Sequence, residues 1–352
     1  MAEIIVASAP TKVILAGEHA AVYGATALAA PISPRNCIFL ERRAGKPGLV
    51  LENPAAPRWR ATLGGDGAFS GNPACRGFLL MASRILREEG TGIAEQGAIR
   101  ARLEFSGSPK GTGNSASIAA ALAIALFTHL GKTPARDKVF RAVQVAEKEV
   151  HGISTYLDAW TVLSGSAQRF HKEWNKQGRM ELFFEKVRAG LPRGTELLVI
   201  DTLRRGEAPQ ATAELLATFA RHFFHKSADN VGGKERMAAC HAFNPVIRQI
   251  EAQLKTEGDA RALGECLDEN HELLRRAGVS SPGIEEARKI ALANGALGAK
   301  LTGSGGRGGA VIALAWEKDV PAIKQNLERK KMKADPAKFA KEGPRIEKRT
   351  EK

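Results

Sequence analysis

The chain has 352 residues, and 43% of them are hydrophobic, which is enough to build a core and excludes a disordered protein. Cys37, Cys75, Cys240 and Cys266 lack the paired spacing of a zinc site or a disulfide framework, so we expect a reduced, cytoplasmic protein. No apolar run approaches the roughly 18 residues that span a bilayer, and no secretory signal is recognised.

The formal net charge of +14 raises the question of nucleic-acid binding. Residues 329–352 alone carry a net +6, and the rest is spread along the chain. Aromatic residues, which stack on bases, make up only 6%. Nucleic-acid binding is therefore disfavoured, and an enzyme for anionic substrates fits the charge at least as well.

The first half of the chain predicts strands and helices in alternation. Short apolar or alternating runs predict strands at residues 3–9, 12–17, 97–105 and 156–165, the first two joined by a turn at Pro10. Longer runs predict a buried helix at residues 115–130 and an amphipathic helix at 135–150, ending at Gly152. Residues 41–75, rich in Gly, Pro and Ala, are expected to form a flexible insertion.

The second half predicts the same mixture. Strands are expected at residues 195–202, 298–302 and 310–316, and helices at 208–225, 244–256, 259–277, 282–294 and from about Asp319. Residues 329–352 are expected to form a solvated extension. This pattern predicts an α/β (α+β) protein with two domains, residues 1–190 and 191–352.

The segment GTGNSAS, Gly111 to Ser117, follows a predicted strand and opens a predicted helix. Glycines allow close backbone approach, and the first turn of a helix offers free N–H groups to a phosphate. The spacing matches neither a Walker A loop nor a dinucleotide-binding loop. A tight turn with a serine cap therefore explains the segment as well as a phosphate loop does.

Three charged residues stand in apolar surroundings. Glu147 shares a predicted helix face with Phe140 and Val143, where a carboxylate is costly unless it is paired with or bound to a cation. Asp158 interrupts an apolar run and could accept a proton or bind a metal; Lys12 opens an apolar strand. A salt bridge for Glu147 and a turn position for Asp158 are the alternatives, which these residues alone leave open.

In order, these segments resemble the GHMP kinase superfamily, and within it most resemble the mevalonate kinases. APTKVILAGEHAAVYG at residues 9–24 resembles the first family motif, and GTGNSASIAAA resembles the second, usually GLGSSA. EKEVHGISTYLD matches the acid, His-Gly and acid spacing that follows, and KLTGSGGRGG at residues 300–309 resembles the third motif. The first and third motifs are specific, and the matches span residues 9 to about 313.

The resemblance implies a two-domain fold, with an N-terminal domain like part of a ribosomal protein and a ferredoxin-like C-terminal domain. It implies ATP- and Mg²⁺-dependent phosphorylation of the primary hydroxyl of mevalonate, a step of isoprenoid biosynthesis, with Asp158 as base and Lys12 as its electrostatic partner. ATP would contact Lys110, Gly111, Thr112, Gly113, Asn114, Ser115 and Ser117. Mg²⁺ would be held by Ser115 and Glu147, and the acceptor would contact Lys12, Glu18, His19, Thr202, Gly303 and Ser304. The expected partners are these two small molecules, and a homodimer is compatible with the resemblance.

The chain departs from the family pattern at five positions. Thr112 replaces the usual Leu and Asn114 the first Ser of the second motif, and Pro109 is displaced by one residue. Thr11 stands where glycine is usual, and Arg307 interrupts the glycines of the third motif. These changes bear on substrate choice more than on kinase chemistry. A kinase for phosphomevalonate or a different alcohol, and a catalytically silent ATP-binding homologue, are the alternatives.

Overall fold

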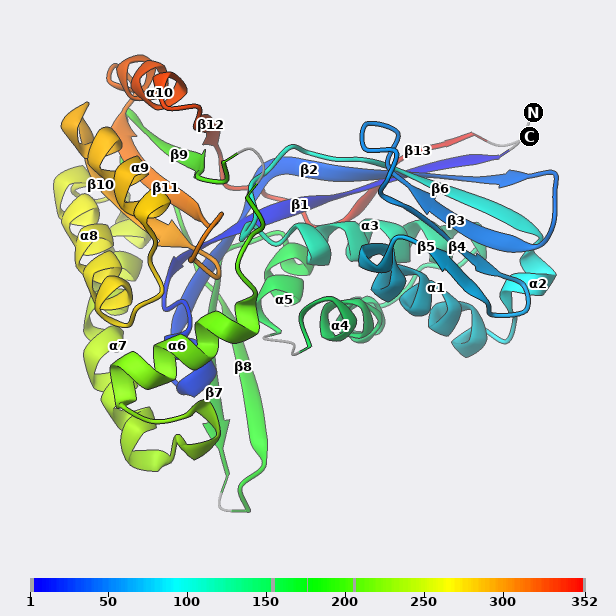
Figure 1. Cartoon of the computed structure of the whole chain (residues 1–352), viewed down its shortest axis with the longest axis horizontal. Coiled ribbons are helices and arrows are strands. Elements are labelled where there is room, and N and C mark those ends of the chain that lie inside the picture. Colours follow the sequence, from blue (N-terminus) through cyan, green and yellow to red (C-terminus); the bar gives the residue numbers. More distant parts are fainter. Residues whose placement is uncertain (1–2, 153–155, 176, 205–206, 351–352) are drawn as a thin grey trace.

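The computed structural model describes residues 3–152, 156–175, 177–204 and 207–350, apart from the side chain of His151. Within these ranges the strands form two sheets, each with helices packed against it (Figure 1). The two ends of the chain lie together at one end of the larger sheet, because Ile4 pairs with Thr350.

The larger sheet is mostly antiparallel. Its described strands run in the order β13-β1-β2-β6-β3-β4-β5, with β7 beside β2 and β8 beside β7, and only β3 and β6 pair in parallel. The strands are β1 (Ile4–Ala16), β2 (Ala27–Arg43), β3 (Gly48–Glu52), β4 (Arg60–Gly64), β5 (Phe69–Gly71), β6 (Ala98–Glu104), β7 (Gln168–Trp174), β8 (Met180–Lys186) and β13 (Arg345–Thr350).

Helices cover one face of this sheet. They are α1 (Arg76–Glu88), α2 (Ile93–Gln96), α3 (Asn114–His129), α4 (Arg136–His151) and α5 (Leu157–Ser164). The uncharged helix α3 lies against β1 and β2 and also contacts α1, α4 and α5 (Figure 1). Because α3 is buried along most of its length, its first turn is held firmly beside the end of β1.

The smaller sheet is antiparallel, in the order β10-β11-β9-β12 among the described strands. The strands are β9 (Thr195–Asp201), β10 (Ala296–Thr302), β11 (Ala310–Trp316) and β12 (Lys333–Ala337). The helices of this half are α6 (Thr212–Phe224), α7 (Gly233–Thr256), α8 (Ala260–Arg276), α9 (Pro282–Ala293) and α10 (Val320–Arg329). The end of β1 shares a hydrophobic core with these helices and with β9, which joins the two halves.

Most of the predicted elements are confirmed. The strands expected at residues 97–105, 195–202, 298–302 and 310–316 correspond to β6, β9, β10 and β11, and the buried and amphipathic helices correspond to α3 and α4. The mixed α/β class is therefore confirmed. The later helices are also present, although α7 begins at Gly233, well before the expected residue 244.

The two short strands expected around Pro10 are in fact one continuous strand, β1. The pairing with β2 shifts its register between Pro10 and Thr11. A bulge of this kind accommodates a residue that has no N–H to donate, so proline interrupts the ladder without ending the strand.

The strand expected at residues 156–165 is wrong, because Leu157–Ser164 form helix α5. Leu157 and Ala159 are buried on either side of the less buried Asp158, as they would be in a strand, and Thr161 and Leu163 are also buried. Val162 is buried too, and an apolar run this short does not distinguish strand from helix by its pattern.

Two segments expected to be irregular are strands. Residues 41–75 contain β3, β4 and β5, and the tail expected to be a solvated extension supplies β12 to the smaller sheet and β13 to the larger one. The side chains of β13 are mostly exposed, so backbone pairing with β1, rather than apolar burial, orders it. The division at residue 190 stays a prediction: β8 ends at Lys186 and β9 begins at Thr195, whereas β13 returns to the larger sheet.

Candidate active site

A cavity of about 470 Å³ lies where the end of β1, the first turn of α3, helix α5 and the loop after β10 meet. We call it the glycine-loop cavity. Its lining includes eleven of the predicted site residues: Lys12, His19, Lys110, Gly111, Gly113, Asn114, Ser115, Glu147, Asp158, Gly303 and Ser304. Four predicted residues do not line it: Glu18, Thr112, Ser117 and Thr202.

The loop before α3 has the backbone geometry of an anion site. Gly111 and Gly113 have φ of 94° and 69°, and Gly113 caps a helix of 16 residues. The first N–H groups of α3 consequently point out of the helix end into the cavity wall, where the helix dipole favours negative charge. A Cβ on Gly113 would stand 2.8 Å from Cγ of Lys12, so glycine is required there to admit the lysine stem.

Thr112 and Asn114, which depart from the family pattern, form hydrogen bonds within the loop before α3. The Asn114 amide donates to the carbonyl oxygens of Ser108 and Pro109, each at 3.0 Å, and Thr112 Oγ1 donates to Pro109 O at 2.7 Å. Ser117 Oγ donates to Ala9 O at 2.8 Å, which fastens α3 to β1. These polar groups are therefore used to hold the loop in shape.

Lys12 and Asp158 form an ion pair in the cavity wall, with 3.0 Å between Nζ and Oδ1. The lysine side chain is 1% exposed and the aspartate side chain 23% exposed. Lys12 Nζ also donates to Gly111 O at 3.0 Å, which links β1 to the loop before α3, residues 105–113, here called the glycine loop. Asp158 lies in the first turn of α5, where the helix dipole stabilises an ionised carboxylate.

Glu147 is buried on α4, at 4% exposure, and its Oε1 has no hydrogen-bond partner among the described residues. Burial, followed by the neighbouring charge of Asp158, raises the pKa of Glu147 to about 7, while the Ser115 hydroxyl and Lys12 act in the opposite direction. A carboxyl group in this position gains from a bound cation, which would replace the missing partner.

No group of three or more His, Cys, Asp and Glu side chains within the described residues is arranged to hold a metal ion. Glu147 and Ser115 nevertheless offer oxygens beside the first turn of α3. Mg²⁺ is commonly held by one or two carboxylates together with substrate phosphates and water. These residues fit such a cation when a phosphate completes its shell.

His19 is fixed in one tautomer. Its Nε2 lies 2.8 Å from the carbonyl oxygen of Ser304, and since a carbonyl only accepts, Nε2 carries the proton and Nδ1 is an acceptor. Nδ1 is buried and has no partner among the described residues. Burial lowers the pKa of His19 to about 4, so the ring is neutral near pH 7. It is suited to accept a hydrogen bond from a ligand hydroxyl.

Two predicted acceptor residues are engaged elsewhere. Glu18 is fully buried in an ion pair with Lys300, and Thr202 Oγ1 donates to the carbonyl oxygen of Gly309. The neighbours of Thr202, Asp201 and Leu203, line the cavity instead. β9 ends at Asp201, so Thr202 and Leu203 lie in the segment that follows the strand.

Sequence reasoning missed Phe105 and Lys300. Phe105 follows the alternating residues Ile99, Ala101 and Leu103, whose side chains are buried, but β6 ends at Glu104 and the ring of Phe105 lines the cavity with 42% exposure. Lys300 looks like a strand residue, and only the folded chain shows that it meets Glu18.

Lys110 donates a hydrogen bond to the carbonyl oxygen of Gln210, so the glycine loop is also linked to the segment before α6.

The structure is a two-sheet α/β protein with a cavity beside a glycine-rich loop, and comparisons with known proteins relate it to small-molecule kinases. The family model described as GHMP kinases C terminal matches residues 247–334. Mevalonate kinase of Aeropyrum pernix is 29% identical over 349 residues, which cover 97% of this chain and 98% of the relative. Mevalonate kinase of Pyrococcus furiosus is 27% identical over 329 residues, covering 89% and 90%. Residues 247–334 thus match the GHMP kinase C-terminal family, and nearly the whole chain is similar to mevalonate kinases, which are GHMP kinases.

Solved structures show the same fold. Mevalonate kinase of Methanococcus jannaschii has a TM-score of 0.75 at 20% identity, with 95% of this chain and 98% of that chain covered. Galactokinase of Lactococcus lactis has a TM-score of 0.73 at 17% identity, with 97% and 95% covered. Because kinases for different alcohols share this fold, the fold alone does not select the acceptor.

No helix in the described part of the chain combines the length and apolar character required to cross a membrane.

Proposed function

We propose that the protein transfers the terminal phosphoryl group of ATP, with Mg²⁺, to the primary hydroxyl of mevalonate and so forms 5-phosphomevalonate. The observation that carries this proposal is the 3.0 Å ion pair of Lys12 and Asp158, in the wall of the cavity that the first turn of α3 also lines. Phosphoryl transfer needs chiefly in-line positioning and neutralisation of the transferring charge. A carboxylate, a cation and an anion-binding helix end in one cavity supply both.

In this proposal Asp158 accepts the proton of the acceptor hydroxyl. Lys12 orients the carboxylate, and its ammonium also contacts Gly111 O, so its positive charge lies between the acceptor side and the glycine loop. The hydroxyl proton moves to an Oδ atom of Asp158 while the attacking oxygen forms its bond to the terminal phosphorus of ATP, and the bond from that phosphorus to the β–γ bridging oxygen breaks to release ADP. Lys12 stabilises the negative charge that develops on the acceptor oxygen and on the transferring phosphoryl group.

Ser115 and Glu147 would hold Mg²⁺ in this proposal. The support is the donor set, a hydroxyl and a buried carboxylate whose Oε1 lacks a partner among the described residues. When bound, the ion would neutralise charge on the phosphates of ATP. Glu147 must be ionised to bind a cation, so its own proton is released when the cation binds.

The choice of mevalonate rests on the relatives and on the acceptor end of the cavity. Mevalonate kinases align with nearly the whole chain, and a similar solved structure, from L. major at 23% identity and a TM-score of 0.73, is in complex with R-mevalonate. At this end, Nδ1 of His19, which has no partner among the described residues, would accept a hydrogen bond from a substrate hydroxyl, with Ser304 beside it.

The test is ADP release by the purified protein with mevalonate, phosphomevalonate, homoserine and galactose as separate acceptors. We expect turnover that depends on Mg²⁺ and is fastest with mevalonate. Faster turnover with another alcohol would refute the substrate assignment and retain the kinase. No turnover with any of them, with ATP still bound, would favour a catalytically silent homologue.

A further inference from the structure

A buried ion pair joins the two halves of the molecule beneath the glycine-loop cavity. Lys300, on β10 of the smaller sheet, contacts Glu18, which follows β1 of the larger sheet, and both side chains are 0% exposed. Neither residue lines the cavity. Lys12 is close enough for its charge to act on both partners.

Further hydrogen bonds fasten the same two strands together. Lys300 Nζ also donates to Ile14 O at 3.3 Å, between the two strands, and to Leu301 O on its own strand at 2.6 Å. Thr302 Oγ1 donates to Ile14 O at 3.0 Å and accepts from Ile14 N at 2.8 Å. The end of β1 is therefore held in one register against the end of β10.

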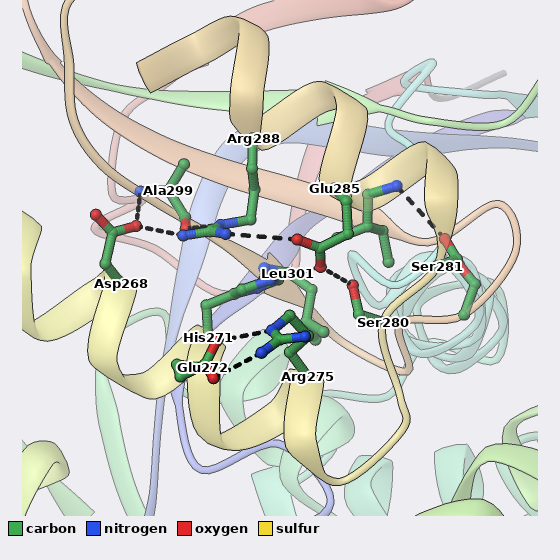
Figure 2. A network of polar contacts seen from close by, with 12 residues as sticks. Asp268, His271, Glu272, Arg275, Ser280, Ser281, Glu285, Arg288, Ala299 and Leu301 are labelled. Atoms are coloured by element: carbon green, nitrogen blue, oxygen red, sulfur yellow. Dashed lines mark hydrogen bonds and ion pairs between the residues drawn. The ribbon is translucent and has the colours of Figure 1, made fainter. Parts of the chain in front are cut away.

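The outer edge of β10 is fixed by side chains from α8 and α9, as Figure 2 shows. Ala299 N donates to Asp268 Oδ1 at 3.0 Å, and Arg288 bonds both Asp268 and the carbonyl oxygen of Ala299. Leu301 N donates to His271 Nδ1 at 3.1 Å, and the other ring nitrogen of His271 contacts Glu285. These bonds flank Lys300 along the strand, so its backbone has little freedom to shift.

Each partner is followed by a segment of the proposed site. His19 comes directly after Glu18, and Gly303 and Ser304 follow β10, where Ser304 O contacts the imidazole. Gly303 touches the glycine loop, since a Cβ at Gly303 would collide with Gly111 O. A shift between β1 and β10 would thus displace the acceptor end of the cavity relative to the loop before α3.

Packing alone does not explain a charged pair at this position. A buried ion pair seldom adds net stability over apolar side chains of similar volume, because both charges lose their hydration. Glu18 Oε2, moreover, is buried without a partner among the described residues. The protein therefore keeps this buried ion pair at a cost in folding stability, as is common where a functional site requires one arrangement.

We propose that Glu18 and Lys300 are positioning residues, which set the acceptor end of the cavity relative to Lys12 and the glycine loop without contacting substrate. This inference rests on the proposed kinase function. It assigns to Glu18 a role different from the substrate contact expected from its motif, and it adds Lys300, which no motif role covered.

The test compares Glu18→Gln, Lys300→Met and the double variant with wild type. The double variant replaces the charged pair by a neutral pair of similar volume, so it should fold even if a single variant does not. Arg84→Met with Glu88→Gln is the matched control, since this ion pair lies on the surface of α1 with side chains 53% and 46% exposed. Melting temperature, kcat and the KM values for ATP and for the acceptor are measured for each.

We expect the double variant to melt near the wild-type temperature while its kcat/KM for the acceptor falls about 100-fold, the size of effect that a misplaced site causes. The KM for ATP should stay near the wild-type value, because the loop before α3 is held by β1 and α3 contacts that the variant leaves intact. Wild-type kcat and acceptor KM in the double variant would overturn the inference. So would equal changes in both KM values that follow the melting temperature.

The wild-type acceptor panel separates this result from the proposed function. If wild type uses another alcohol, the variants are compared with that alcohol, and the positioning role stands or falls on the same measurements. If wild type phosphorylates no alcohol, the proposed function and this inference fail together. Normal wild-type turnover with unaffected variants contradicts the positioning role alone.

Discussion

Replacing Asp158 by asparagine removes a charge and a proton acceptor while keeping the shape of the side chain. The amide oxygen of the new side chain could still accept the hydrogen bond from Lys12, whose Nζ lies 3.0 Å from Oδ1 of Asp158 and also contacts Gly111 O at 3.0 Å. The lysine therefore keeps two neutral acceptors, and the glycine loop should retain its shape. We expect the loss to fall on turnover, with ATP binding preserved.

The size of that loss follows from the role proposed for the carboxylate. A positioned general base contributes about 10²- to 10⁴-fold, which corresponds to about 3 to 5 kcal/mol of transition-state stabilisation. The substitution also leaves the charge of Lys12, at 1% exposure, without its counterion, and this lowers the stability of the folded protein. ADP release gives kcat, and calorimetry gives the affinity for ATP. Asp201→Asn is the control, because Asp201 also lines the cavity but its Oδ1 accepts from Leu203 N, at 2.9 Å.

Turnover by Asp158→Asn within about tenfold of wild type would refute the reasoning, since a base worth so little lies below the range expected for general base catalysis. An equal loss in Asp201→Asn would show instead that any carboxylate in this cavity supports activity. Loss of ATP binding in Asp158→Asn would show that the residue maintains the glycine loop.

Four further changes have defined outcomes. Glu147→Gln should raise the Mg²⁺ concentration needed for half-maximal activity, and an unchanged metal titration would argue against ligation. His19→Asn should raise the acceptor KM. The pKa of His19 is about 4 in the folded protein and 6.5 in the unfolded chain, so the unfolded chain binds the proton first as pH falls. Wild type therefore loses stability between pH 6.5 and pH 4. The variant lacks this group, so its free energy of unfolding should depend less on pH in that range. Phe105→Ala should raise the KM for ATP, because we expect the adenine base to stack on this ring of the cavity wall. Inhibition by tripolyphosphate, which has no base, should be unchanged. Phe183→Ala, which removes an exposed ring outside the cavity, is the control. Truncation after Ala337 removes β13 from the edge of β1 and should lower the melting temperature, whereas an unchanged value would mean that the pairing contributes nothing.

The truncation reverses an expectation drawn from composition. A basic tail with few apolar side chains predicts a solvated extension, because nothing in it needs burial. The structure instead pairs Arg345–Thr350 with β1 through the backbone, and Arg35 donates to the carbonyl oxygen of Gly343. Backbone pairing with a distant strand leaves no mark on composition, and for that reason the tail could not be recognised as a strand.

The order of motifs along the chain indicated a resemblance to the GHMP kinases, and local pattern predicted most of the helices and strands. The alanine-rich run after Ser115 has no charge to expose, so it must be a buried helix, and the glycines before it permit the positive φ that the loop requires. Glu147 on an apolar helix face was already anomalous by periodicity, and burial at 4% explains why its pKa is raised. These features depend on neighbours within a few residues.

Local pattern does not specify contacts between distant residues: the family resemblance implied that Lys12 and Asp158 act as partners, and the tertiary structure gives the geometry of their contact. Lys12 and Asp158 are far apart along the chain, and nothing local requires that they meet at 3.0 Å. Glu18 belongs to a motif that predicted a substrate contact, yet the approach of β10 buries it against Lys300. A motif specifies which residues are available, whereas the packing of one sheet on another determines which of them face the cavity and which hold the two halves together.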